Sequence, residues 1–174
     1  MSPVLEYALP DSGATEALGR ALARAFIGDP SDSQQPGAVV YLHGDLGAGK
    51  TTCVRSLLRT LGVTGLVRSP TYTLVETYML SGLTCVHVDL YRLQTLTEVD
   101  ELGLRDQVGP RNLLLVEWPE KGARALPPAD LALELRYAGD ARRAQLSANT
   151  PLGAVWLKKL GLDNSLSPYV SNLT

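Results

Sequence analysis

The segment Gly44–Thr51 contains the residues whose types and spacing point most directly to chemistry. It reads G-D-L-G-A-G-K-T and fits the pattern G-x-x-x-x-G-K-T, which is typical of phosphate-binding loops. Glycines allow backbone N–H groups to turn toward phosphate oxygens, and Lys50 can reach the β- and γ-phosphates of a nucleotide. The hydroxyl of Thr51 is placed to bind Mg²⁺. The segment therefore predicts a nucleoside triphosphate site.

Two carboxylates follow apolar strands further along the chain. Leu113–Val116 ends at Glu117, and Val86–Val88 ends at Asp89. Ligands of open α/β sheets collect at the carboxyl ends of strands, so both side chains could approach a nucleotide. Glu117 could hold Mg²⁺ directly or through water, or orient an attacking water; Asp89 could share the metal shell or polarise a water. Either residue could instead be a solvated carboxylate at a strand end.

Hydroxyl, aromatic and basic side chains accompany these carboxylates. The hydroxyls of Ser69–Thr73, including Thr71, could sense the γ-phosphate and Mg²⁺ as a switch segment does, but the segment also fits a turn before a strand. Trp118 could stack on a ligand or partner, or simply pack in the protein. Arg92 could neutralise a carboxylate or contact phosphate.

The expected elements position these residues around one site. An apolar run over 38–42 predicts a buried strand and residues 52–61 predict a helix, so the loop leads from a strand into a helix N-terminus. Gly62 is expected to cap the end of that helix. The other expected elements are a strand over 4–9, a helix over 14–26 capped by Asp11 or Ser12, a hairpin of strands 71–78 and 83–88, a short helix from a capping box at Thr97 and Asp100 towards Val108, a buried strand over 112–116, antiparallel strands 131–137 and 143–148, and a helix from Thr150 to Gly161.

Composition favours one globular domain. The 174 residues are 45% hydrophobic and 20% charged, so a domain with its own core is expected over 1–163, followed by a polar, flexible segment over 164–174. Residues 28–37 are typical of a loop. The net charge of −2 provides no global basic field, so nucleic-acid binding would be local or through a partner, and neither DNA nor a membrane is an expected partner.

The remaining sequence features are consistent with a cytoplasmic protein. No signal peptide and no apolar run of membrane-spanning length are visible. Two cysteines, Cys53 and Cys85, fit reduced buried thiols. His43 and His87 stand apart from any Cys/His cluster, so both are expected to be core or surface residues rather than zinc ligands.

Four segments together resemble one family. They are G-D-L-G-A-G-K-T-T over 44–52, S-P-T-Y-T-L-V-E over 69–76, D-L-Y-R-L over 89–93 and V-E-W-P-E over 116–120. In this order and spacing they resemble the TsaE (YjeE) family of P-loop ATPases, which act in bacterial tRNA threonylcarbamoyladenosine biosynthesis. The resemblance extends from about Leu9 to Ala148. The phosphate loop is shared by many families, whereas the second and fourth segments are more specific.

The resemblance implies a fold, a cofactor and partners. The implied fold is a single three-layer P-loop α/β domain with a mostly parallel central sheet and added antiparallel strands. The implied cofactors are ATP or ADP with Mg²⁺, with weak, partner-stimulated hydrolysis. The implied partners are TsaD and TsaB, which transfer threonylcarbamoyl to an adenosine beside the tRNA anticodon. The ATPase would regulate or reset that complex and meet tRNA only through it.

The resemblance also assigns roles to individual residues. The implied catalytic residues are Lys50, Asp89 and Glu117, and the implied Mg²⁺ ligands are Thr51 and Glu117. The residues implied to bind the nucleotide are Asp11, Gly44, Leu46, Gly47, Ala48, Gly49, Lys50, Thr51, Thr52, Thr71, Asp89, Glu117, Trp118 and Arg142.

Three other functions fit the phosphate loop. A small-molecule kinase would also need an acceptor pocket and usually an arginine-bearing lid, for which only Arg142 and Arg143 are candidates. A GTPase would carry a guanine-reading segment of the Asn-Lys-x-Asp type, which the sequence lacks. A nucleotide-binding module without turnover would not need Asp89 and Glu117.

Overall fold

Four parallel strands form the middle of one mixed sheet. The computed structural model describes residues 4–26 and 35–171, and within them the strand order is β1-β7-β6-β2-β5-β4-β3. The neighbours β6, β2, β5 and β4 run parallel, while β3, β7 and β1 pair antiparallel at the two edges. The strands are β1 (Val4–Leu9), β2 (Ala38–His43), β3 (Val75–Leu80), β4 (Leu83–Asp89), β5 (Asn112–Glu117), β6 (Leu131–Ala138) and β7 (Ala141–Ala148). The expected α/β class, with antiparallel strands added to a parallel centre, is confirmed.

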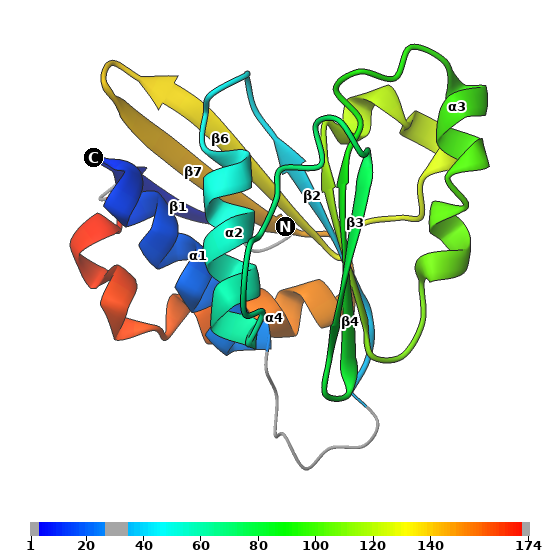
Figure 1. Cartoon of the computed structure of the whole chain (residues 1–174). Helices are drawn as coiled ribbons and strands as arrows, with labels where there is room; N and C mark the ends of the chain where they lie inside the picture. Colours follow the sequence, from blue (N-terminus) through cyan, green and yellow to red (C-terminus); the bar gives the residue numbers. More distant parts are fainter. Residues whose placement is uncertain (1–3, 27–34, 172–174) are drawn as a thin grey trace.

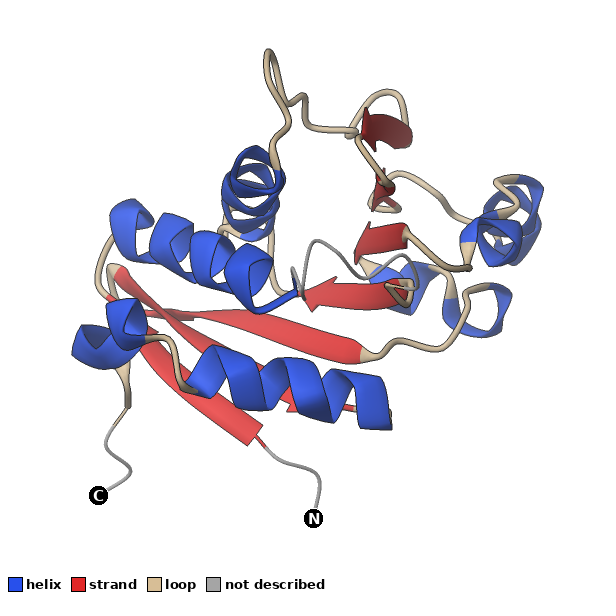
Figure 2. Ribbon diagram, turned by 90° about the horizontal axis from the view of Figure 1, so that it is seen from below, coloured by secondary structure: helices blue, strands red, loops and turns tan. Residues whose placement is uncertain are grey.

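Helices lie on both sides of this sheet (Figures 1 and 2). One face carries α1 (Ser12–Phe26), α2 (Lys50–Leu61) and α4 (Pro151–Gly161). The other face carries α3 (Leu96–Glu101) with the short 3-10 helices η1 (Leu104–Gln107) and η3 (Ala123–Ala125). Two further 3-10 helices are η2 (Pro119–Lys121) and η4 (Asn164–Tyr169). Across the described residues, no helix has both the length and the apolar character that crossing a membrane requires.

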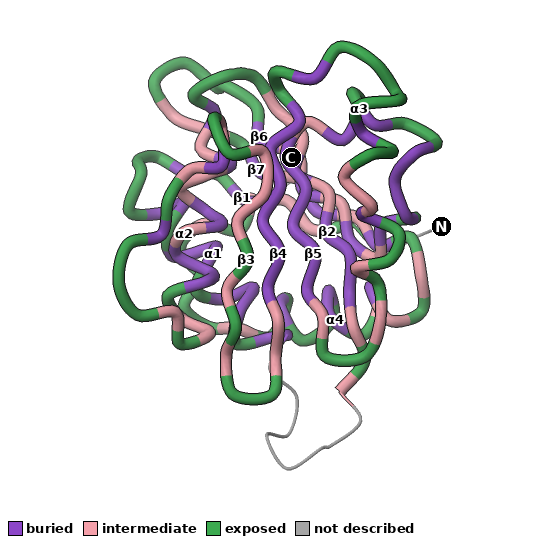
Figure 3. The backbone as a smooth tube through the Cα atoms, turned by 45° about the vertical axis from the view of Figure 1, so that its right-hand side comes forward, coloured by how far each residue is buried: buried purple, intermediate pink, exposed green. Residues whose placement is uncertain are grey.

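Side-chain alternation along the strands separates two hydrophobic cores. Val40 and Leu115 belong to the core beneath α1, α2 and α4, whereas Val39 and Leu114 belong to the core beneath α3. Successive strand side chains point to opposite faces, so strands covered on both faces must be apolar throughout. Figure 3 shows β4 and β5 buried over most of their length, while the edge strand β3 has exposed positions.

Helices α1 and α2 are in close contact. A Cβ atom added to Gly19 of α1 would lie 2.3 Å from the carbonyl oxygen of Cys53 in α2, so only glycine permits this separation. Across the same contact, the Ser56 hydroxyl donates a 2.8 Å hydrogen bond to the carbonyl oxygen of Glu16. Helix α1 therefore supports α2, and α2 begins at the phosphate-binding loop.

Three local expectations differ from the structure. Residues 71–74 form a turn in which Leu74 has φ of 66°, so β3 begins only at Val75. The capping box of α3 is formed by Thr95 and Glu98, because the Glu98 carboxylate reaches back to the Thr95 backbone N–H at 2.9 Å. The proposed box at Thr97 is therefore wrong. The helix expected to continue towards Val108 ends at Glu101 and is followed by η1.

The segment expected to be flexible after residue 163 packs on the domain. Within it, η4 contacts α1 and β1, and Leu166 is buried. Asp163 accepts a hydrogen bond from Arg24 at 2.9 Å, and Tyr7 forms a β-bridge with Val170. The apolar side chain of Leu166 explains the difference, because its burial favours an ordered segment. Residues 172–174, and residues 28–34 of the expected loop, lie outside the described residues.

Candidate functional site

The loop between β2 and α2 turns sharply enough to expose its backbone amides at a helix start. Gly44, Gly47 and Gly49 have φ values of 135°, 78° and 107°, a region that other residues rarely adopt. At Gly44 a Cβ atom would also lie 2.2 Å from the carbonyl oxygen of Leu135. Gly49 is the N-cap of α2 and makes no side-chain cap. The first backbone amides of α2 thus have no side-chain cap, and a helix start of this kind is suited to an anion.

Lys50 is the buried cation of this loop. Only 4% of its surface is exposed. Its Nζ donates to the carbonyl oxygens of Gly44 and Asp45, the latter at 2.9 Å, and lies 4.2 Å from the ring centre of Trp118. Burial lowers the pKa of Lys50, and the nearby carboxylates, Glu117 foremost, oppose that shift. The site therefore concentrates one positive charge beside the loop amides.

Glu117 lies at the centre of a hydrogen-bonded group. The Thr51 hydroxyl donates to both carboxylate oxygens of Glu117, at 2.9 and 3.1 Å. The Nε2 atom of His87 lies 2.8 Å from one of the same oxygens. Glu117 is 2% exposed and His87 is fully buried. The carboxylate is thus held from two sides rather than solvated at a strand end.

His87 is the residue that sequence reasoning missed. The sequence predicts only a core or surface histidine, and the residue is indeed in the core, but its ring contacts Glu117. An ionised Glu117 carboxylate can only accept, so in that state the hydrogen bond takes the proton of Nε2, and Nδ1 has no partner among the described residues. A usable signal existed: His87 lies two residues before Asp89, so both side chains share one face of β4.

Asp89 lies on the strand next to Glu117, paired with it in register. Its carboxylate accepts hydrogen bonds from the Thr71 hydroxyl at 3.2 Å and from the backbone N–H of Tyr91 at 2.9 Å. The hydroxyls of Thr71 and Ser69 lie 2.7 Å apart. The turn after α2 thus reaches the carboxyl end of β4.

Aromatic side chains border the same region. Trp118 has φ of 58°, and its ring lies 4.9 Å from that of Tyr91. Arg92 stacks over the ring of Tyr72 at 4.2 Å, so it contacts an aromatic ring and not a carboxylate among the described residues. The Trp118 ring is therefore both packed and turned toward Lys50.

Two cavities meet at the loop. The larger, of about 380 Å³, is lined by most of the predicted residues: Leu46, Gly47, Gly49, Lys50, Thr51, Thr52, Thr71, Asp89, Glu117 and Trp118. The smaller, of about 130 Å³, is lined by three of the remaining four, Asp11, Ala48 and Arg142, and shares Gly47, Gly49 and Thr52 with the first. Gly44 lines neither cavity, but its carbonyl oxygen accepts from Lys50.

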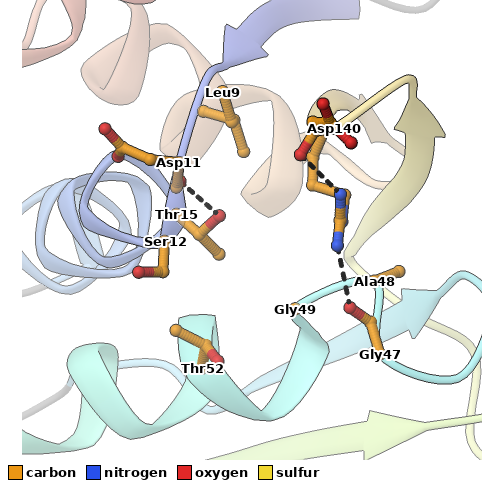
Figure 4. Close-up of a pocket in the computed structure, with 10 residues that line it drawn as sticks. Leu9, Asp11, Ser12, Thr15, Gly47, Ala48, Gly49, Thr52 and Asp140 are labelled. Atoms are coloured by element: carbon orange, nitrogen blue, oxygen red, sulfur yellow. Dashed lines mark hydrogen bonds between the residues drawn. The ribbon is translucent and has the colours of Figure 1, made fainter.

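The smaller cavity lies between the start of α1 and the loop (Figure 4). Asp11 accepts from the backbone N–H of Ala14 at 2.8 Å and so caps α1, one of the two expected possibilities. Arg142 donates to the carbonyl oxygen of Gly47 at 3.4 Å and stacks on Tyr137 at 3.9 Å. The arrangement brings β1, α1 and β7 against the phosphate loop.

The oxygen atoms of Thr51 and Glu117 fit a magnesium ion. Mg²⁺ is usually bound by one or two protein oxygens, with phosphate and water oxygens completing its shell. Thr51 supplies a hydroxyl and Glu117 a carboxylate, with their oxygens 2.9 Å apart. No cluster of three or more His, Cys, Asp or Glu side chains able to hold a metal occurs in 4–26 or 35–171. An ion here would therefore need ligands from a bound nucleotide.

Comparison with protein-family profiles matches residues 9–145 to "Threonylcarbamoyl adenosine biosynthesis protein TsaE". The chain belongs to the TsaE family. The matched range includes the phosphate loop, Asp89, Glu117 and Arg142. Among TsaE relatives, "tRNA threonylcarbamoyladenosine biosynthesis protein TsaE" of Haemophilus influenzae is 40% identical over 88% of this chain and 94% of its own. The protein of the same name from Synechocystis is 42% identical over 67% of this chain and 71% of its own.

One solved structure has the same fold as this chain. The crystal structure of Bacillus subtilis YdiB matches with a TM-score of 0.72 and 28% identity, covering 92% of this chain and 96% of YdiB. The similarity extends over nearly the whole α/β domain.

Proposed function

We propose that this TsaE family member binds and hydrolyses ATP with Mg²⁺, and that it regulates or resets a threonylcarbamoyl transferase complex of TsaD and TsaB. The observation that carries the proposal is the convergence of Lys50, Thr51 and Glu117 at one glycine-rich helix start. The relatives named above are described as tRNA threonylcarbamoyladenosine biosynthesis proteins, which supports this biological setting. A cytoplasmic location follows from the same role.

The residues divide the proposed work between binding and hydrolysis. The loop amides and Lys50 bind the β- and γ-phosphates, because fixed N–H dipoles and a cation stabilise negative charge in a water-poor site. Thr51 and Glu117 would hold Mg²⁺, which would act there as a Lewis acid and neutralise phosphate charge. Asp89, in register with Glu117, orients the attacking water. Thr71, which is hydrogen-bonded to Asp89, changes its contacts according to whether the γ-phosphate is present.

The base and ribose are assigned to the smaller cavity. It shares three loop residues with the larger cavity, so a nucleotide with its phosphates at Lys50 extends towards Asp11 and Arg142. Trp118 and Tyr91 border the opposite side, near the proposed γ-phosphate. Leu46 and Tyr72, at 67% and 80% exposed, offer apolar surface for a partner next to that cavity.

Lys50→Ala tests the loop assignment. Loss of the buried cation should lower Mg·ATP affinity and turnover at least about tenfold, since a charge-assisted contact to phosphate is lost. Isothermal titration with ATP and GTP, together with phosphate release, measures both. Lys158→Ala on α4, an exposed lysine, is the matched control. Wild-type turnover in Lys50→Ala would refute the assignment.

Glu117→Ala separates binding from hydrolysis in the same assays. The variant should keep much of the nucleotide affinity and lose phosphate release, because the proposed role of Glu117 is to hold the magnesium ion while Lys50 and the loop amides still bind the phosphates. Stimulation of phosphate release by purified TsaD and TsaB would support the partner-coupled role. Transfer of phosphate to an added small-molecule acceptor would instead favour the kinase alternative, which is weakened because Arg142 is engaged with Tyr137 and Gly47.

A further inference from the structure

A groove between α1 and α2 carries three arginines and lies beside the nucleotide cavities. Arg55 and Arg59 are four residues apart on α2 and share one face of the helix. Arg20 of α1 lines the same groove, whose volume is about 260 Å³. Glu16 is the one acidic residue among those that line it. The groove thus holds three positive charges against one negative charge, in a chain whose net charge is −2.

The α2 arginines are not used by the described part of the fold. Arg20 pairs with Glu16 on its own helix at 3.6 Å, with both side chains about half exposed. No hydrogen bond or ion pair joins the guanidinium group of Arg55 or Arg59 to another residue in 4–26 or 35–171. Burial raises the pKa of Tyr78, and the nearby charge of Arg55 opposes that rise without a hydrogen bond between the two side chains. The two guanidinium groups are therefore available to a ligand.

The groove is built on a rigid base. The Ser56 hydroxyl, at its floor, is bonded to the Glu16 carbonyl oxygen at 2.8 Å, and Gly19 fixes the close approach of the two helices. The Thr60 hydroxyl is bonded to the carbonyl oxygen of Ser56 at 2.9 Å. A ligand that enters a preformed groove loses less free energy to the ordering of the protein.

We propose that this groove binds an acidic segment of a protein partner. Arginine guanidinium groups bind carboxylates in paired hydrogen bonds, and Arg55 and Arg59 are spaced to take successive acidic side chains. A nucleic acid is the poorer candidate, because phosphate-backbone binding draws on a broad basic surface, whereas this chain is acidic overall and the groove contains Glu16.

The groove meets the proposed nucleotide site at Thr52, which lines all three cavities. A partner segment in the groove would therefore lie along the helix whose N-terminus faces the phosphates. The inference itself does not depend on nucleotide binding, because it rests on the surfaces of α1 and α2 alone.

A binding assay with charge variants tests the inference. The probe is a short fluorescent peptide in which Glu alternates with Ser, and its control has Gln in place of Glu. We expect the acidic peptide to bind the wild-type chain at near-physiological salt and the Gln peptide to bind far more weakly. The double variant Arg55→Gln, Arg59→Gln should lose roughly tenfold in affinity for the acidic peptide.

The matched control is Lys158→Gln with Lys159→Gln on α4, which changes the net charge equally at exposed positions away from the groove. It should stay within about twofold of wild type, as expected for exposed charges without a ligand. Equal losses in both double variants, or no binding of the acidic peptide, would overturn the proposal. Tighter binding of a single-stranded RNA that depends on the same two arginines would also overturn it.

ATP titration of the same variants separates this result from the proposed function. The arginine variant should bind Mg·ATP as the wild type does, because neither arginine lines the two nucleotide cavities. Loss of peptide binding with intact ATP binding supports the groove, whereas normal peptide binding with no ATP binding would refute only the nucleotide site.

Discussion

At the residue scale, the orientation of Glu117 depends on two neighbours of different kinds. Thr51 approaches from the start of α2, and His87 approaches from within the sheet. A hydrogen-bonded neighbour of a metal ligand commonly affects metal affinity or activity by about 10- to 100-fold. Under the proposal that Glu117 holds Mg²⁺, His87 would therefore act as a positioning residue for Glu117.

His87→Ala should lower ATP hydrolysis by about tenfold or more while ATP affinity changes much less, because the carboxylate loses one of its two supports. His87→Gln should recover part of the lost hydrolysis, since its amide N–H can donate to Glu117. Steady-state phosphate release measures hydrolysis and ATP titration measures affinity, and both are expressed per folded molecule.

Cys85→Ala provides the control for His87. Cys85 is buried on the same face of β4, and burial raises the pKa of its thiol to about 12, so it is a neutral packing residue. The Cys85→Ala substitution should lower the unfolding temperature, measured by thermal unfolding, and should change the rate of ATP hydrolysis little. If His87→Ala behaves like Cys85→Ala, His87 has only a packing role.

At the element scale, the contact between α1 and α2 decides where the phosphate loop lies. Thr15 of α1 is within 3.2 Å of the position that a Cβ on Gly49 would take, and Gly19 meets the backbone of α2. Both contacts act on the first turns of α2. A change in the separation of the two helices should therefore move the loop as well as weaken the core.

Gly19→Ala tests this coupling. The added Cβ would meet the Cys53 carbonyl oxygen at 2.3 Å, so we expect a loss of about 1–3 kcal/mol in the free energy of unfolding, despite the better helix propensity of alanine. Nucleotide affinity should fall as well. Denaturant unfolding and ATP titration measure the two effects.

Gly161→Ala, at the end of α4, is the matched control for that substitution. Its added Cβ would be 3.5 Å from the side chain of Leu5, an ordinary contact, so stability should be unchanged or rise by less than about 1 kcal/mol. Equal effects of the two substitutions would show that the α1–α2 separation is not critical.

At the scale of the whole molecule, the proposed nucleotide site draws residues from both halves of the sheet. Asp11 follows β1, Arg142 lies on β7, and Asp89 and Glu117 end β4 and β5. A ligand that contacts these elements together binds only the folded chain. Its binding free energy therefore adds to the stability of the fold.

Saturating Mg·ATP should raise the unfolding temperature of the wild-type chain. At about 100 times the dissociation constant, the added stability is about 2.7 kcal/mol, which corresponds to a rise of about 5–10 °C for a domain of this size. Differential scanning fluorimetry with ATP, ADP and GTP measures it, and Lys50→Ala should reduce the rise. An unchanged unfolding temperature in wild type would contradict nucleotide binding.

The sequence by itself determined the parts whose physics is local. We could predict the glycine-rich loop, its flanking strand and helix, and the carboxylates that end β4 and β5. Each of these features depends on residues that are neighbours in the sequence, because such residues set the backbone freedom, the hydrophobic periodicity and the ends of strands. The family resemblance pointed to the same residues, and the family itself is confirmed. A local pattern can also mislead. Both Thr95 and Thr97 fit the sequence pattern of a capping box, but in the structure the box is formed by Thr95.

Only the tertiary structure decided which distant residues share a site. It placed His87 against Glu117, Arg20 beside Arg55, and Arg142 against the loop at Gly47. It also buried Leu166 in a segment whose composition is typical of a flexible tail. These outcomes depend on strand order, register and helix separation, which arise from the packing of the whole chain and have no signature in a single stretch of residues.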